Sequence, residues 1–150
     1  VGIMSRSGGM TTEIANLLTQ RGLGQSTAIS MGGDPIIGST FADLMPLWEA
    51  DAETRGLVIF GEPGGGLEAQ LAEHVQSRGT RLPIVAFIAG SFMEEMPGLR
   101  FGHAGSIVEG RADTAAEKAR ILRSAGIVVA DDFSQIPSLL LDAMKQAGPA

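Results

Sequence analysis

The chain alternates short apolar runs with longer amphipathic segments, and it does so five times within 150 residues. The apolar runs have the length of buried strands, whereas the segments between them have the apolar spacing of helices. Strands that alternate with helices imply βαβ crossovers, and therefore a parallel sheet with helices on both faces. The strands are predicted at 1–4, 26–31, 56–60, 83–89 and 127–130, and the helices at 10–21, 40–50, 67–78, 114–126 and 133–146.

The number of elements and the chain length predict one α/β domain, residues 1–150, with a flavodoxin-like fold. We expect a doubly wound five-stranded parallel sheet in the order 2-1-3-4-5, within a three-layer α/β/α arrangement. Pro46 is expected to bend or interrupt its helix, Asp113 or Thr114 to cap helix 114–126, and Gly126 to end it. Because the chain opens directly on an apolar strand-like run, we expect a domain excised from a longer protein.

The composition narrows the classes of function. Cysteine is absent, which excludes disulfides, thiolate metal sites and thiol nucleophiles. The net charge of −6 argues against nucleic acid or an anionic membrane as the main partner. No apolar run approaches the ~18 residues needed to span a bilayer, so a cytoplasmic location is expected. Glycine accounts for 21 of 150 residues, about twice its usual share, which indicates tight loops where the backbone approaches something closely.

Three glycine-rich loops follow strands that neighbour one another in the predicted sheet. SRSGG follows the first strand, GEPGGG follows the third, and a long loop with GHAG follows the fourth. Ligands of such sheets bind beyond the carboxyl ends of the strands, near the point where the strand order reverses. We therefore expect Ser7, Glu62 and His103 to lie close together, although they are far apart in the sequence.

Each loop allows a functional and an ordinary interpretation. Ser7, Gly8 and Gly9 open a helix whose free amides favour an anion, although N-capping by Ser7 would also explain the serine. Glu62 could orient an imidazole by accepting its N–H, or it could be a solvated loop carboxylate. His103 could be a general base or a nucleophile, or a loop histidine without a task.

Two further features carry less information. The segment GGDPIIGS (32–39) could be a substrate loop or only a turn built on its Asp-Pro pair. No metal site is expected, because His74 lies on a different helical segment from His103 and no second ligand stands at a suitable spacing.

Four motifs, in this order and spacing, resemble the ligase domain of the succinyl-CoA synthetase alpha subunit. They are SRSGGMTTE, GGDPIIGSTF, GEPGG, and GHAGSIVEG followed by TAAEK. ATP-citrate lyase and the malate–CoA and citrate–CoA ligases share this domain, and the likeness covers essentially the whole chain. It implies an acid–thiol ligase of the succinate–CoA type, ADP- or GDP-forming, with the reaction NTP + carboxylate + CoA ⇌ NDP + phosphate + acyl-CoA.

The same resemblance gives roles to the candidate residues. In this family a phosphoryl group passes through the histidine of GHAG, which makes His103 the phosphohistidine and Glu62 the carboxylate that orients it. The helix start at Ser7–Gly9 becomes one of the anion cradles for the phosphohistidine and the substrate. Thr12 stands where succinate enzymes have a substrate-contacting tyrosine. A small dicarboxylate is the expected substrate, and the identity of the acid stays open among succinate, malate, the tricarboxylate citrate and others.

The resemblance also implies components outside this chain. CoA, and ATP or GTP with Mg, are expected as substrates held mainly by other domains, with no tightly bound cofactor here. The expected partners are an N-terminal CoA-binding domain and a beta-type grasp subunit or domain. One alternative is a non-catalytic or regulatory anion-binding module with a vestigial His103 loop. Another is an FMN module with SRSGG as its phosphate loop, which the shortage of aromatic residues disfavours.

Overall fold

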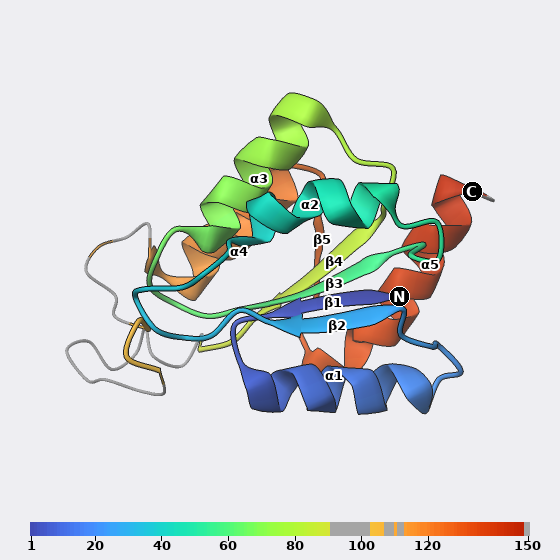
Figure 1. Ribbon diagram of the computed structural model, residues 1–150, viewed down its shortest axis with the longest axis horizontal. Coiled ribbons are helices and arrows are strands. Elements are labelled where there is room, and N and C mark those ends of the chain that lie inside the picture. The colour runs from blue at the N-terminus through green and yellow to red at the C-terminus, as the bar shows by residue number, and fades with distance from the viewer. Residues whose placement is uncertain (91–102, 107–109, 111–112, 149–150) are drawn as a thin grey trace.

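The computed structural model describes residues 1–90, 103–106, 110 and 113–148. In these residues five strands alternate with five α-helices (Figure 1). The strands are β1 (Gly2–Ser5), β2 (Thr27–Ser30), β3 (Leu57–Gly61), β4 (Ile84–Ile88) and β5 (Val128–Val129). The helices are α1 (Gly8–Thr19), α2 (Phe41–Ala50), α3 (Leu67–Arg78), α4 (Ala115–Ser124) and α5 (Ile136–Ala147), the last preceded by a 3₁₀ turn (Phe133–Gln135). None of these helices is both long and apolar enough to cross a membrane.

The five strands form one parallel sheet in the order β2-β1-β3-β4-β5, so the predicted topology is confirmed. The chain first builds outward from β1 to β2 and then returns to place β3 on the other side of β1. The order therefore reverses at β1, and the loops that leave β1 and β3 start side by side.

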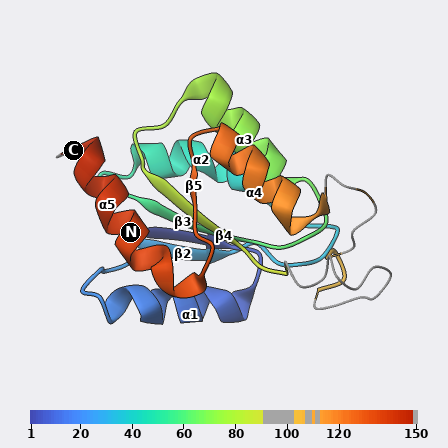
Figure 2. The ribbon, with the colours of Figure 1, turned by 180° about the vertical axis from the view of Figure 1, so that it is seen from behind.

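Two apolar layers hold the helices on opposite faces of the sheet. Ile3 and Val58 point into the layer under α1 and α5, whereas Met4 and Ile59 point into the layer under α2, α3 and α4. This alternation follows from the two-residue period of a strand, and both faces are apolar because both are covered. Seen from behind, the same two groups of helices flank the sheet (Figure 2).

The starts of α2 and α4 follow the expected capping chemistry, and Pro46 lies inside α2. Thr40 and Asp43 form a reciprocal capping box at the start of α2, and Thr114 caps α4. Gly126 adopts a φ of 81° immediately after the end of α4. Pro46 was expected to bend or interrupt its helix; the interruption is wrong, since α2 continues through Pro46 to Ala50, and the bend stays a prediction. Burial of one face of α2 on the sheet compensates for the hydrogen bond that proline cannot donate.

Candidate active site

Loops that are distant in the sequence contact one another at the carboxyl ends of the strands. Arg6, after β1, donates to carbonyls of the loop after β3. His103 contacts Glu62 in that same loop, and Gly105 contacts Gly33 in the loop after β2. The site thus lies at the edge of the sheet where the strand order reverses.

His103 and Glu62 form the centre of this site. The Nδ1 atom of His103 lies 3.0 Å and 2.8 Å from the two carboxylate oxygens of Glu62. Glu62 is only 9% exposed, and the Ser106 hydroxyl donates to its Oε2 atom at 3.0 Å. A carboxylate accepts hydrogen bonds, so this contact assigns the ring proton to Nδ1 and leaves the lone pair on Nε2. The His103 side chain remains 40% exposed, which leaves the ring open to a reactant.

The segment 32–39 packs directly against the histidine. The Gly105 amide donates to the Gly33 carbonyl at 2.9 Å. A Cβ atom at Gly33 would lie 2.0 Å from the Cγ atom of His103, so only glycine leaves room for the imidazole there. The sequence left open whether segment 32–39 is a substrate loop or only a turn. In the structure its first residues form one wall of the His103 site.

The start of α1 has the form of an anion cradle. The Ser7 hydroxyl accepts from the Met10 amide at 3.4 Å, so Ser7 is the N-cap. The amides of Gly8 and Gly9 have no hydrogen-bond partner among the described residues, and both glycines are exposed. Thr12 is exposed one turn further along α1. Figure 1 places this helix start at the same end of the sheet as segment 103–106, but no hydrogen bond among the described residues joins it to His103.

Arg6 was not singled out from the sequence, yet it is buried in the site with 3% exposure. One of its terminal nitrogens donates to the carbonyls of Glu62 at 3.2 Å and Gly64 at 2.7 Å. Its Nε atom is buried and has no partner among the described residues. Because the guanidinium stays charged at any ordinary pH, it gives the loop after β3 a permanent cationic anchor.

Comparison with known proteins identifies the family of the chain. The family model described as CoA-ligase matches residues 4–128, which is most of the chain. The chain belongs to the CoA-ligase family. The match includes Glu62, His103 and the start of α1, so the site described above lies within the family's domain.

The individual relatives are of two kinds. The ADP-forming succinate–CoA ligase alpha subunits of Staphylococcus aureus and Staphylococcus epidermidis are 43% and 42% identical to this chain over 148 residues. These matches cover 99% of the chain and 48% of each relative, so the chain spans about half their length. Among solved structures, the ATP citrate lyases of Methanosaeta concilii, with (3S)-citryl-CoA, and of Methanothrix soehngenii, with citrate and coenzyme A, superpose with TM-scores of 0.88 and 0.89. Both are 26% identical and match 97% of this chain and 24% of their own.

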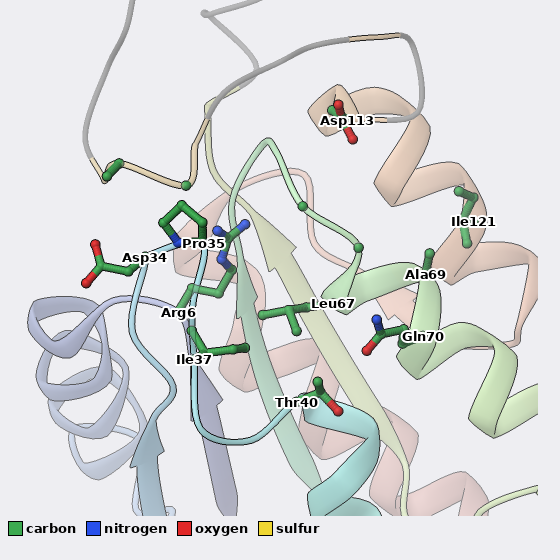
Figure 3. Close-up of a pocket in the computed structure, with 14 residues that line it drawn as sticks. Arg6, Asp34, Pro35, Ile37, Thr40, Leu67, Ala69, Gln70, Asp113 and Ile121 are labelled. Carbon is green, nitrogen blue, oxygen red and sulfur yellow. The ribbon is translucent and has the colours of Figure 1, made fainter.

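A cavity of about 610 Å³ opens beside the histidine segment (Figure 3). Arg6 and Pro35 line one side of it, and Ala69 and Gln70 of α3 line the other. Gly105, two residues after His103, also lines the cavity, so the cavity adjoins the site. Its volume is sufficient for a small organic ligand.

The sequence predicted Glu62 and His103 as site residues but not the residues that support them. The contact between Glu62 and His103 follows from strand order and motif position, and Ser106 lies in the same quoted motif without having been assigned a role. Arg6 could have been found, because it stands inside SRSGG. Within the described residues no cluster of three His, Asp or Glu side chains could hold a metal ion.

Proposed function

We propose that this chain is the phosphohistidine-carrying domain of an NDP-forming acid–CoA ligase, with His103 as the phosphoryl carrier. The observation that carries the proposal is the contact of His103 Nδ1 with Glu62, at 2.8 Å, inside a CoA-ligase domain. In the neutral imidazole that contact puts the proton on Nδ1, so Nε2 carries the lone pair and is the nucleophilic nitrogen.

The chemistry at His103 is two successive phosphoryl transfers. The Nε2 lone pair attacks the γ-phosphorus of the nucleotide, an N–P bond forms, and the P–O bond breaks with its electrons leaving on NDP. Nδ1 keeps its proton, so the ring becomes cationic and the Glu62 carboxylate offsets that charge. A carboxylate oxygen of the acid then attacks the phosphorus, and the electrons of the N–P bond return to Nε2. The resulting acyl phosphate is the species that the CoA thiolate attacks, releasing phosphate.

The start of α1 supplies the complementary charge for the phosphoryl group. Two free amides at a helix N-terminus offset negative oxygens, and the absence of side chains at Gly8 and Gly9 lets those oxygens approach. We assign Ser7, Gly8 and Gly9 to phosphate binding and Thr12 to the acid substrate on this basis. CoA, and ATP or GTP with Mg, would be bound mainly by parts of the protein outside this chain, including an N-terminal CoA-binding domain and a beta-type partner.

The test uses the complete protein that contains this domain, assembled with its partner subunit. Incubation with γ-labelled ATP or GTP should place acid-labile, base-stable label on this chain, and His103→Ala should carry none. Addition of CoA with succinate, malate or citrate should discharge the label, and the acid that does so names the substrate. A well-folded assembly that takes no label from either nucleotide would contradict the proposal and favour a non-catalytic anion-binding module.

Glu62→Gln should slow labelling about 10- to 100-fold, the usual effect of removing a partner that orients a histidine. The glutamine amide can donate as well as accept, so it no longer holds the proton on Nδ1 or offsets the ring charge. The initial rate of label incorporation measures this effect. Glu73→Gln, the same change at an exposed position of α3, should label at the wild-type rate. Equal rates for both variants would show that Glu62 does not orient the nucleophile.

A further inference from the structure

Lys118 is a buried cation that the proposed chemistry does not use. It lies on α4, one turn after its N-cap Thr114, and is only 2% exposed. It is the lysine of the TAAEK motif, for which the sequence suggested no role. Burial lowers the pKa of Lys118, while the neighbouring Glu68 carboxylate opposes that shift.

The Lys118 ammonium donates three hydrogen bonds to the described residues, and all of them go to one small region. Its Nζ atom donates to the Glu62 carbonyl at 2.9 Å, to the Gly64 carbonyl at 2.5 Å and to Glu68 Oε2 at 2.5 Å. The other oxygen of Glu68 accepts from the Glu62 amide at 3.3 Å. The amide and the carbonyl of Glu62 are therefore both tied to the Lys118–Glu68 pair.

The loop that carries Glu62 needs such external support. It reads GEPGGG, in which Pro63 fixes its own φ, but Gly64 and Gly65 have φ values of 80° and 67°, so the glycines leave the rest of the loop backbone little restricted by its sequence. The Glu68 carboxylate reaches the loop at Gly61. A Cβ atom at this position would lie 2.5 Å from Glu68 Oε1, so a side chain there would exclude the carboxylate. The loop is thus built to admit the Glu68 carboxylate, and Lys118 neutralises that carboxylate.

We propose that Lys118 is a positioning residue for His103, acting through Glu62 by fixing the loop backbone from which the orienting carboxylate projects. The inference rests on the function proposed above for His103 and Glu62. A displacement of about 1 Å in a reacting group can cost about 100-fold in rate. Loss of the Lys118 contacts should therefore reduce phosphorylation of His103 even when the fold is intact. Arg6 continues to hold the same carbonyls, so the effect should be partial.

The test separates positioning from stability with two variants of the complete assembly. Lys118→Met removes the cation but leaves Glu68 buried without its partner, which destabilises the fold. Lys118→Met with Glu68→Gln removes both charges and keeps an oxygen that can accept from the Glu62 amide. We expect the double variant to regain much of the thermal stability and yet to label about 10- to 100-fold more slowly than wild type. Lys145→Met, which alters an exposed lysine on α5, is the matched control and should label normally.

Two results of the labelling experiments would overturn the positioning role. One is a double variant that labels at the wild-type rate. The other is a Glu62→Gln effect of the same size in the Lys118→Met background as in wild type, because a residue that acts through Glu62 must make that effect smaller.

Nitrogen NMR of the histidine-labelled assembly provides a readout that does not require turnover. Wild type should hold His103 with the proton on Nδ1, and the double variant should show a mixture of the two tautomers. An unchanged tautomer would contradict the positioning role. If wild-type protein takes no label but its tautomer responds to the Lys118 change, the phosphohistidine function fails while the positioning role stands.

Discussion

In a Gly33→Ala variant, phosphorylation of His103 is expected to fall by about 100-fold. The added Cβ atom would lie 2.0 Å from Cγ and 2.3 Å from Nδ1 of the imidazole, far inside contact distance. The loop cannot retreat freely, because the Gly33 carbonyl accepts from the Gly105 amide in the turn that follows His103. The ring must therefore move, and its contact with Glu62 is lost. The initial rate of labelling from γ-labelled nucleotide measures the effect on the complete assembly.

Gly38→Ala is the matched control for this change. Gly38 lies in the same loop, and a Cβ atom there would meet nothing within 4 Å, so the variant should label like wild type. Thermal unfolding of both variants should show that the fold survives. If Gly33→Ala were labelled as fast as Gly38→Ala, the described placement of His103 against Gly33 would be wrong for the reactive state.

Lys118→Met is expected to lower the free energy of unfolding by about 3–5 kcal/mol, the usual cost of removing one partner of a buried ion pair. Glu68 is fully buried, and Lys118 is its ion-pair partner, at 2.5 Å. Without the lysine, the buried Glu68 carboxyl group loses its ion-pair partner. Denaturant unfolding of the complete protein, followed by circular dichroism, measures the loss.

Glu68→Gln in the same chain should restore part of the stability lost in Lys118→Met, since it removes the unpaired charge. Lys145→Met changes an exposed lysine paired with Asp142 at 3.4 Å and should shift the free energy by less than about 1 kcal/mol. A Lys118→Met loss no larger than that of Lys145→Met would show that the buried pair does not stabilise the fold as its geometry indicates.

The fold could be predicted from the sequence because its signals are local and repeated. Five apolar runs separated by helical segments leave few alternatives for a chain of this length, and the strand order follows from the flavodoxin-like pattern. Thr114 and Gly126 mark their helix ends through capping chemistry that depends only on neighbouring residues. Pro46 does not interrupt α2, because tertiary packing, which the local pattern does not contain, outweighs one missing hydrogen bond.

The site could be predicted only in part, for a related reason. Glu62 and His103 each follow a strand, so the topology alone brings them to one edge of the sheet. The closeness of Gly33 to the imidazole depends on how two loops pack, and glycine spacing does not encode that distance. Lys118 projects from a helix back to a loop 54–56 residues earlier in the chain, and nothing local to the TAAEK motif indicates that reach.

The expected excision from a longer protein, the CoA-binding domain, the beta-type partner and the identity of the acid are not tested by the described residues, and they stay predictions. The loop expected at residues 90–111 also lies largely outside the described residues. Its described portion, 103–106, carries the histidine and two of the contacts that define the site.

The most direct test of the central claim is to identify which ring nitrogen of His103 takes the phosphoryl group. In the proposed mechanism Glu62 holds the proton on Nδ1, so the phosphoryl group is expected to form its bond with Nε2. Labelled wild-type assembly, digested under alkaline conditions and resolved by chromatography against both phosphohistidine isomers, should yield the Nε2 isomer alone, in the peptide that contains His103. Recovery of the Nδ1 isomer, or of label that persists in His103→Ala, would contradict the account.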